Sequence, residues 1–263
     1  MKTDCGTHIK VIKVGGNVID NPAALDALVA DLARMEGPRI LVHGGGKEAT
    51  RLSARLDIPT TMIEGRRVTD AATIDVVTMV YAGLINKRIV ARLQAAGTNA
   101  IGMCGADGNM IPARRRAPEP IDYGFVGDID PMTVNDGLIA SLLNDGIMPV
   151  FCAICHDGKG NLLNCNADSV ASAVAVAASR IAPTDLTFCF EMPGVMADTD
   201  NPDSLIPSIT PALYESLKAD GIVSKGMIPK IDNAFAAIRQ GVASVRICRS
   251  DSILGNVGTV ISA

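Results

Sequence analysis

Residues 11–19, V-I-K-V-G-G-N-V-I, form an apolar run that ends in two glycines. The aliphatic residues of this run predict a short buried strand followed by a turn. Lys13 lies inside the strand, where an ammonium group is costly to bury unless an anion accompanies it. Gly15 and Gly16 carry no side chain, so their backbone N–H groups can approach a phosphate or a carboxylate closely. On this stretch alone, an edge lysine and an ordinary turn are the simpler interpretation.

A second glycine run follows the next predicted strand. Residues 39–42, R-I-L-V, continue directly into H-G-G-G-K-E, and a helical pattern then extends to Leu56. Glycines at a strand-to-helix junction, among them Gly45 and Gly46, expose amides beside a helix N-terminus, which favours a bound anion over a merely flexible turn. The run is not a Walker A loop, because the earlier glycine of that motif is absent and Glu48 replaces the Ser or Thr that would hold magnesium.

The composition is typical of an α/β protein. Hydrophobic residues make up 48% of the 263 residues and aromatic residues only 3%, so the core is expected to consist of Val, Ile, Leu and Ala. Strand and helix patterns alternate along the whole length without repeats or a linker, which predicts one domain with an open, mainly parallel sheet between helical layers. The net charge of −4 and pI of about 5.4 argue against nucleic acid as a partner.

The chain shows neither an apolar signal core at its N-terminus nor a run long enough to span a membrane, so we expect a cytoplasmic protein without a membrane partner. Its seven cysteines form an odd set in mostly apolar surroundings, which favours reduced, buried thiols. Residues 152–156, C-A-I-C-H, match the haem c and redox patterns, but they follow the apolar run M-P-V-F and are better explained as the end of a buried strand.

Further candidate ligand-binding residues lie at the ends of other predicted elements. Arg66 and Arg67 end a turn-rich segment, and a guanidinium group can grip a carboxylate with two parallel hydrogen bonds. The helix predicted from Ala71 to Leu93 is apolar on more than one face and is a candidate subunit contact. A helix is also predicted over 133–144.

Polar residues also cluster near two later helix starts. Asn164, Asn166 and Asp168 alternate where the helix predicted over 169–181 begins; one of them could cap it, but three suggest an additional role. Lys225 and Lys230 flank a glycine and another helix start, again surroundings that suit an anion.

Together, these features suit phosphoryl transfer, in which catalysis consists mainly of positioning and charge stabilisation. With three histidines, no G-x-S-x-G motif and no metal-ligand cluster, the sequence gives little support to a serine or zinc hydrolase. A carboxylate acceptor is already ionised at neutral pH and needs no general base, so an acceptor of this kind fits best.

Five motifs carry a resemblance to a known family: VIKVGGNVI, VHGGG, GRRVTDAATID, NLLNCNAD and GIVSKGMIPKIDNA, in that order along nearly the whole chain. In order and spacing they resemble the amino acid kinase family, and within it the members that act on an acylated glutamate. The resemblance implies a three-layer αβα sandwich, with a lobe at about 1–182 for the acyl-glutamate and for dimer contacts and a lobe at about 183–263 for ATP. It implies ATP-dependent phosphorylation of the γ-carboxylate of N-acetyl-L-glutamate, a step of arginine biosynthesis.

The resemblance also implies roles for individual residues. Lys13 and Lys230 would stabilise the transferring phosphoryl group, and Asp168 would orient both lysines. The implied substrate-binding residues are Gly45, Gly46, Arg67, which would clamp the α-carboxylate, and Asn164, which would bind the acylated amino group. The implied nucleotide-binding residues are Gly15, Gly16, Glu191, Gly194, Lys225, Gly226 and Met227. Magnesium would arrive bound to ATP, without a dedicated protein site.

Two departures from the family pattern stand out. Phe190-Glu191 replaces the usual Thr-Asp or Ser-Asp, which leaves the adenine contacts open. The segment before the first strand is too short for the N-terminal helix of arginine-inhibited members, so we expect an arginine-insensitive homodimer. The alternatives are a kinase for N-succinylglutamate or another amino-acid carboxylate, as in an aspartokinase, and a non-catalytic sensor of amino acid or nucleotide.

Overall fold

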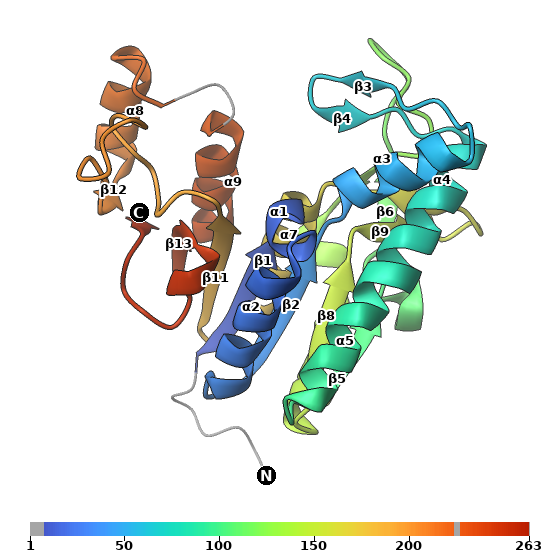
Figure 1. Ribbon diagram of the computed structural model, residues 1–263, viewed down its shortest axis with the longest axis horizontal. Coiled ribbons are helices and arrows are strands. Elements are labelled where there is room, and N and C mark those ends of the chain that lie inside the picture. The colour runs from blue at the N-terminus through green and yellow to red at the C-terminus, as the bar shows by residue number, and fades with distance from the viewer. Residues whose placement is uncertain (1–7, 224–226, 263) are drawn as a thin grey trace.

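A central, mostly parallel sheet organises the molecule. The computed structural model describes residues 8–223 and 227–262 (Figure 1). Within these residues the sheet has eight strands in the order β12-β14-β13-β11-β1-β2-β8-β5, and each neighbouring pair is parallel except β13 and β14. The strands are β1 (Ile9–Val14), β2 (Arg39–His43), β5 (Ala100–Met103), β8 (Met148–Cys152), β11 (Thr184–Phe190), β12 (Ser208–Ile209), β13 (Ser244–Arg249) and β14 (Thr259–Ile261).

Helices cover both faces of this sheet. In Figure 1, α2 and α5 lie in front of the strands and α7 lies behind them. The helices are α1 (Gly16–Ile19), α2 (Pro22–Arg34), α3 (Gly46–Arg55), α4 (Ala71–Thr78), α5 (Asn86–Ala95), α6 (Asp136–Asn144), α7 (Ala167–Ser179), α8 (Pro211–Ala219) and α9 (Ile228–Arg239). The predicted three-layer αβα sandwich with a mainly parallel sheet is therefore confirmed.

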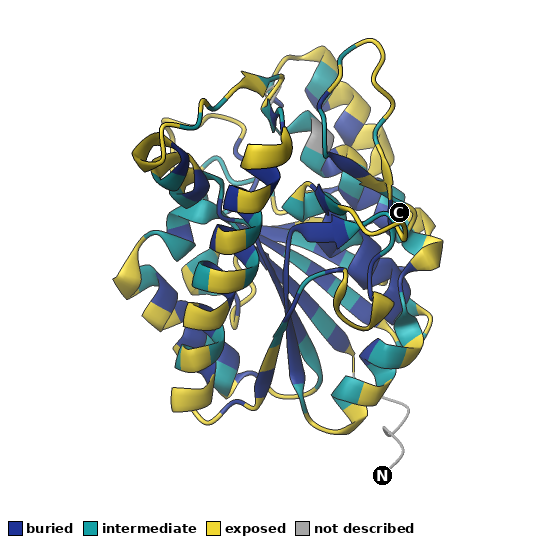
Figure 2. Cartoon of the chain, turned by 90° about the vertical axis from the view of Figure 1, so that its right-hand side faces the viewer, coloured by how far each residue is buried: buried dark blue, intermediate teal, exposed yellow. Residues whose placement is uncertain are grey.

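The stretch that contains Lys13 is the central strand β1. It pairs with β11 on one side and β2 on the other, and Val11, Ile12 and Val14 are at most 1% exposed. A parallel strand with helices over both faces is expected to consist almost entirely of aliphatic residues, and β1 does. Figure 2 shows the buried strands in the centre of the molecule and exposed residues on the outer faces of the helices.

The helix predicted from Ala71 to Leu93 is present, but it is not regular. A π-helical segment, η1 (Met79–Ile85), separates α4 from α5, and the helical run ends at Ala95. The wider turns of a π-helix change which side chains face inward, and such segments often occur at functional sites. Here Tyr81 and Ile85 of the π-helical segment face the second glycine run. Hydrophobic periodicity could not have predicted this contact.

The other sequence predictions need small corrections. The helix predicted over 133–144 begins only at Asp136, because the Asn135 side chain accepts a hydrogen bond from Leu138 N and caps it; residues 131–133 form a separate 3₁₀ turn. The helix predicted over 169–181 spans Ala167–Ser179, because Asn166 caps it.

Three small hairpins lie beside the main sheet. They are β3 (Met62–Ile63) with β4 (Arg66–Arg67), β6 (Ala113–Arg115) with β7 (Gly127–Ile129), and β9 (Ile154–His156) with β10 (Leu162–Asn164). Isolated β-bridges connect the segments next to these hairpins with one another, among them Thr69 with Gly124 and Val126 with Asn164. The sequence predicts a turn-rich segment where the first hairpin forms. It does not predict the third hairpin, which places Asn164 beside the segment that carries Arg67.

Cys152 and Cys155 are fully buried, as expected for the end of a strand, and the six cysteines in the described part of the chain form no disulfide. Among the described residues, no helix combines the length and the apolar character needed to cross a bilayer.

Candidate active site

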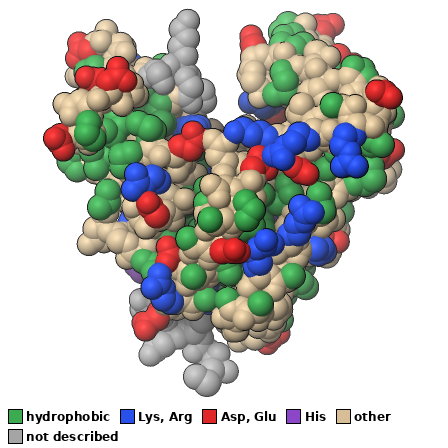
Figure 3. Space-filling model, viewed as in Figure 1, with side chains coloured by type: hydrophobic (Ala, Val, Ile, Leu, Met, Phe, Trp, Pro, Cys, Tyr) green, Lys and Arg blue, Asp and Glu red, His purple; other side chains and the backbone are tan. Residues whose placement is uncertain are grey.

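The predicted ligand-binding residues gather at one edge of the sheet. Strands β1, β2 and β11 run parallel, so their carboxyl ends share that edge, and α3 and α7 begin there. Open α/β sheets bind their ligands at this edge. Figure 3 shows a hollow between the two upper parts of the molecule, with Lys and Arg side chains gathered along its base.

Lys13 is paired with Asp168. Its Nζ atom lies 2.6 Å from Asp168 Oδ1, and their side chains are only 9% and 15% exposed. Asp168 occupies the first turn of α7, where the helix dipole favours a negative charge. Asn166 is the residue that caps α7, by accepting from Asp168 N and Ser169 N, so Asp168 is free to bind the lysine. The pair explains how a buried strand tolerates an ammonium group.

Lys230 reaches the same place from the first turn of α9. Its Nζ atom lies 3.6 Å from the centre of the Phe190 ring, and Lys13 Nζ lies 5.4 Å from the same ring. Burial is the main cause that lowers the pKa of Lys230, and the charge of Lys13 lowers it further. The carboxylates of Asp168 and Glu191 act in the opposite direction and raise this pKa. The structure therefore brings together two lysines that are more than 200 positions apart in the sequence.

The second glycine run is closely packed between β2 and α3. A Cβ atom on Gly45 would lie 2.4 Å from Ile85 Cδ1 and 2.9 Å from Tyr81 Cδ1, so this position has no room for a side chain. Gly45 is the N-cap residue of α3, and no side chain caps that helix. Binding of a ligand by the amides of this turn stays a prediction.

His43, just before the glycines, is fully buried and neutral. Its Nδ1 donates to Gly44 O at 2.8 Å, and its Nε2 accepts from Asn86 Nδ2 at 3.0 Å. Asn86 also donates to Val150 O, and the absence of a Cβ on Gly102 makes room for its amide. Burial lowers the pKa of His43 from 6.5 to about 4, against the effect of the Gly44 hydrogen bond. The histidine thus fixes one carbonyl of the glycine turn.

This buried histidine predicts an acid-sensitive fold. Between pH 6.5 and about 4 the unfolded chain binds a proton at His43 that the folded chain does not. The free energy of unfolding should therefore fall by about 3 kcal/mol as pH decreases across this range, in addition to the effect of carboxylates. Urea titrations of wild type and His43→Gln at several pH values give the free energy of unfolding of each protein as a function of pH. The contribution of His43 is the difference between the two proteins in how steeply this free energy changes with pH. Parallel pH profiles for the two proteins would contradict it.

Arg67 lies at the other end of the glycine turn. It is 7% exposed and donates to Gly46 O at 2.9 Å, Thr50 Oγ1 at 2.8 Å and Thr60 Oγ1 at 3.2 Å, so its guanidinium group is fixed in direction. A cavity of about 170 Å³ beside it is lined by residues that include Gly46, Tyr81 and Asn164.

Asn164 is 8% exposed, and its Nδ2 donates to Thr69 Oγ1 at 3.1 Å. Thr69 in turn donates to Arg67 O, so a buried threonine couples the two predicted substrate-binding residues. Sequence reasoning missed this threonine because its two partners lie in different hairpins.

The predicted nucleotide-binding residues lie around the end of β11 and the starts of α1 and α9. Gly15 and Gly16 form the turn into α1, and a Cβ on Gly15 would come 4.0 Å from Cys189 O, so this turn is open. Glu191 is exposed, and Met227 occupies the N-cap position of α9 without a capping hydrogen bond from its side chain. Lys225 and Gly226 lie outside the described residues.

Gly194 has a packing role in the fold. A Cβ on it would lie 2.6 Å from both Leu205 Cδ1 and Thr259 Oγ1, and Val195 N donates to Thr259 Oγ1. This contact explains why a glycine occurs here, and a nucleotide contact of Gly194 stays a prediction.

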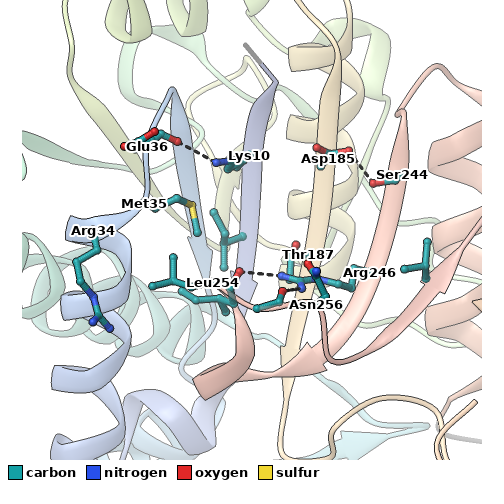
Figure 4. A pocket seen from close by; sticks show the side chains of 14 residues that line it. Lys10, Arg34, Met35, Glu36, Asp185, Thr187, Ser244, Arg246, Leu254 and Asn256 are labelled. Carbon is teal, nitrogen blue, oxygen red and sulfur yellow. Dashed lines mark hydrogen bonds between the residues drawn. The ribbon is translucent and has the colours of Figure 1, made fainter. Parts of the chain in front are cut away.

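A larger cavity, of about 410 Å³, lies near the amino ends of β1, β11 and β13 (Figure 4). Several of its polar side chains already have partners: Lys10 donates to Glu36 O at 2.9 Å, Ser244 to Asp185 Oδ1 at 2.6 Å, and Arg246 to carbonyls of the segment that closes the cavity. These groups are satisfied within the protein and lie at the opposite edge of the sheet from Lys13, so the lysine cluster is the better candidate for an active site.

The fold and the site define a class: α/β sandwiches with a pair of lysines and two glycine turns at the carboxyl edge of a mainly parallel sheet. A sequence model of the amino acid kinase family matches residues 8–249, and the chain belongs to this family.

The chain is similar to known proteins over nearly its whole length. It is 49% identical to acetylglutamate kinase from Phocaeicola vulgatus over 253 residues, which cover 96% of this chain and 98% of that protein. It is 51% identical to acetylglutamate kinase from Cytophaga hutchinsonii over 245 residues, or 93% of this chain and 92% of that protein. The crystal structure of N-acetylglutamate synthase from Neisseria gonorrhoeae shares its fold, with a TM-score of 0.81 at 22% identity, over 98% of this chain and 60% of that chain.

Proposed function

We propose that this protein is an ATP-dependent kinase that phosphorylates the γ-carboxylate of N-acetyl-L-glutamate to give N-acetyl-L-glutamyl 5-phosphate and ADP, in arginine biosynthesis in the cytoplasm. The observation that carries the proposal is the convergence of Lys13 and Lys230 at Phe190, with Asp168 bound to Lys13. Relatives named acetylglutamate kinase that match nearly the whole chain support the choice of substrate.

The residues of the chain divide the work of the reaction. The γ-carboxylate oxygen attacks the terminal phosphorus of ATP, and the bond from that phosphorus to the leaving oxygen of ADP breaks. Lys13 and Lys230 stabilise the negative charge that is spread over the migrating phosphoryl group, and Asp168 orients them. The acceptor is an anion at neutral pH, so no side chain has to remove a proton.

Substrate binding uses the surrounding glycine turns and hairpins. Arg67 clamps the α-carboxylate, Asn164 binds the acylated amino group, and Gly45 and Gly46 N–H groups bind near the attacking carboxylate. Gly15 and Gly16 N–H groups, with the other predicted nucleotide-binding residues, bind ATP in the C-terminal lobe at about 183–263. Magnesium comes bound to the nucleotide phosphates, which supply the oxygen ligands it prefers.

ADP release in a coupled assay tests this function. N-acetyl-L-glutamate, N-succinyl-L-glutamate, L-glutamate and L-aspartate are supplied separately with ATP and magnesium. We expect turnover with N-acetyl-L-glutamate and at most slow turnover with the unacylated amino acids. Faster turnover with N-succinyl-L-glutamate or aspartate would identify another carboxylate kinase, and binding without any ADP release would favour the sensor.

We also propose a homodimer that forms through the helical run α4-η1-α5. Met79 lies in this run and is 52% exposed, although its neighbours Val77 and Val80 are fully buried. One exposed apolar residue is common on a monomer, so the proposal rests on the apolar pattern of the whole run, and Met79 is the position at which the test interrupts it. Sedimentation should show dimers, and Met79→Lys should yield monomers. L-arginine should change neither mass nor activity. Arginine-inhibited hexamers would contradict both expectations.

A further inference from the structure

Phe190 lies at the point where the two lysines meet. It is the last residue of β11, and its ring stacks on Phe188, with ring centres 6.2 Å apart and planes inclined by 17°. Because Phe188 is fully buried, the stack fixes the direction of the Phe190 ring. The Lys230 ammonium group lies 3.6 Å from the centre of the ring, and the Lys13 ammonium group lies 5.4 Å from it. The sequence pattern marked Phe190 as a departure from the family but gave it no role.

We propose that Phe190 is a positioning residue of the phosphoryl-transfer site, whose ring holds the Lys230 ammonium group beside Lys13 and Asp168. This inference rests on the proposed function. A cation over an aromatic face is attracted by the ring quadrupole, at best when both are partly removed from water. The ring forms no ion pair and accepts no conventional hydrogen bond, so Lys230 retains its charge for the phosphoryl group.

The balance of charge explains why an aromatic ring suits this position. Lys13 and Lys230 contribute two positive charges and Asp168 one negative charge. The carboxylate of Glu191 also faces Lys230 but is exposed, so water and salt screen it, and the three other groups leave one net positive charge for the incoming phosphoryl oxygens. A carboxylate in place of the ring would neutralise this charge and compete with the phosphoryl group for Lys230. An aliphatic side chain would remove the attraction of the ring and leave only the carboxylates to stabilise the partly buried ammonium group.

The charged groups that face Lys230 predict how the ring affects its titration. They are Asp168 from α7, Lys13 from β1 and Glu191, which follows β11. Burial and Lys13 both favour the neutral amine, and the ring favours the ammonium form alongside the two carboxylates. Removing the ring should therefore lower the pKa of Lys230 further, by about 0.5 to 1 pH unit.

The first experiment measures this pKa in the ligand-free protein. NMR titration of ¹⁵N-labelled lysine Nζ compares wild type with Phe190→Leu, which keeps the apolar volume, and Phe190→Tyr, which keeps the ring. We expect a lower Lys230 pKa in Phe190→Leu and a pKa close to that of wild type in Phe190→Tyr. An unchanged Lys230 pKa in folded Phe190→Leu would overturn the inference. No substrate is present, so this result does not depend on the proposed reaction.

The second experiment measures turnover with N-acetyl-L-glutamate. Phe190→Leu should lower kcat about 3- to 10-fold and shift the alkaline limb of its pH profile to lower pH. Phe190→Tyr, which keeps the ring, should have the kcat and the pH profile of wild type. The matched control is Phe235→Leu, since Phe235 is 6% exposed and packs on Tyr214 in the same lobe. It should lower the melting temperature without moving the pH profile. An unmoved profile in Phe190→Leu would overturn the inference, whereas a wild type without any kinase activity would overturn the proposed function.

Discussion

Lys230→Ala is expected to lower kcat by about a thousandfold and to change the KM values for ATP and N-acetyl-L-glutamate only a few fold. An ammonium group that faces the migrating phosphoryl group acts most strongly when negative charge accumulates there, in the transition state. Its position over Phe190, beside Lys13 and Asp168, is suited to this role. Initial rates of ADP release at varied concentrations of both substrates give the two parameters separately.

A matched control for Lys230→Ala exists in the same lobe. Lys218 on α8 also lies over an aromatic ring, 4.4 Å from the centre of Tyr214, and pairs with Glu215 at 2.7 Å. Lys218→Ala therefore also removes a lysine that lies over an aromatic ring, but this lysine is not among the predicted site residues, so the variant should leave kcat unchanged. A Lys230→Ala enzyme with the wild-type kcat would remove this residue from the catalytic assignment.

Lys13→Ala should also lower kcat by orders of magnitude, but it is the less selective test. It leaves the Asp168 carboxylate in a poorly exposed place without its partner, and breaking a buried pair in this way costs about 3 kcal/mol of stability. A loss of activity in Lys13→Ala thus combines a catalytic effect with a folding effect. Since Lys230 forms no ion pair as close as this with any residue that the structure describes, its substitution separates the catalytic effect from the folding effect.

The sequence predicted the fold well because local patterns specify it. An aliphatic run is buried when it becomes a central parallel strand, and a glycine-rich end of a strand marks the next turn. Lys13 could be singled out because a charge within such a run has to be compensated, and the structure supplies Asp168 for this purpose.

What the sequence could not predict depends on contacts between distant elements. The π-helical segment at 79–85 fits around Gly45, and the buried His43 is satisfied by Asn86, more than 40 positions away. Thr69, between Arg67 and Asn164, is equally invisible to periodicity. Such positions are set by shape and hydrogen-bond complementarity, for which a single sequence carries no local signal.

Arg67→Lys is expected to raise the KM for N-acetyl-L-glutamate about 10- to 100-fold, with kcat and the KM for ATP nearly unchanged. The side chain keeps its charge but loses the planar fork that grips a carboxylate with two parallel hydrogen bonds, and a hydrogen bond to a charged group contributes about 1.5 to 3 kcal/mol. In the ligand-free structure Nη2 of Arg67 donates to Gly46 O and Thr50 Oγ1, and Nη1 donates to Thr60 Oγ1, so the carboxylate has to replace one Nη2 contact before the fork grips it. These contacts already hold the side chain in one direction, so wild type loses little side-chain entropy on binding.

Arg180→Lys controls for the structural part of this change. Arg180 also bonds backbone carbonyls, at Pro131 and Val134, and pairs with Asp136 at 2.7 Å, but it lies at the far end of α7 from Asp168. Both variants should lose stability, and only Arg67→Lys should bind N-acetyl-L-glutamate more weakly in calorimetric titrations. Equal KM values for wild type and Arg67→Lys would show that the α-carboxylate binds elsewhere. Because the glycine turn and Asn164 are both coupled to Arg67, the binding site would then have to be reassigned as a whole.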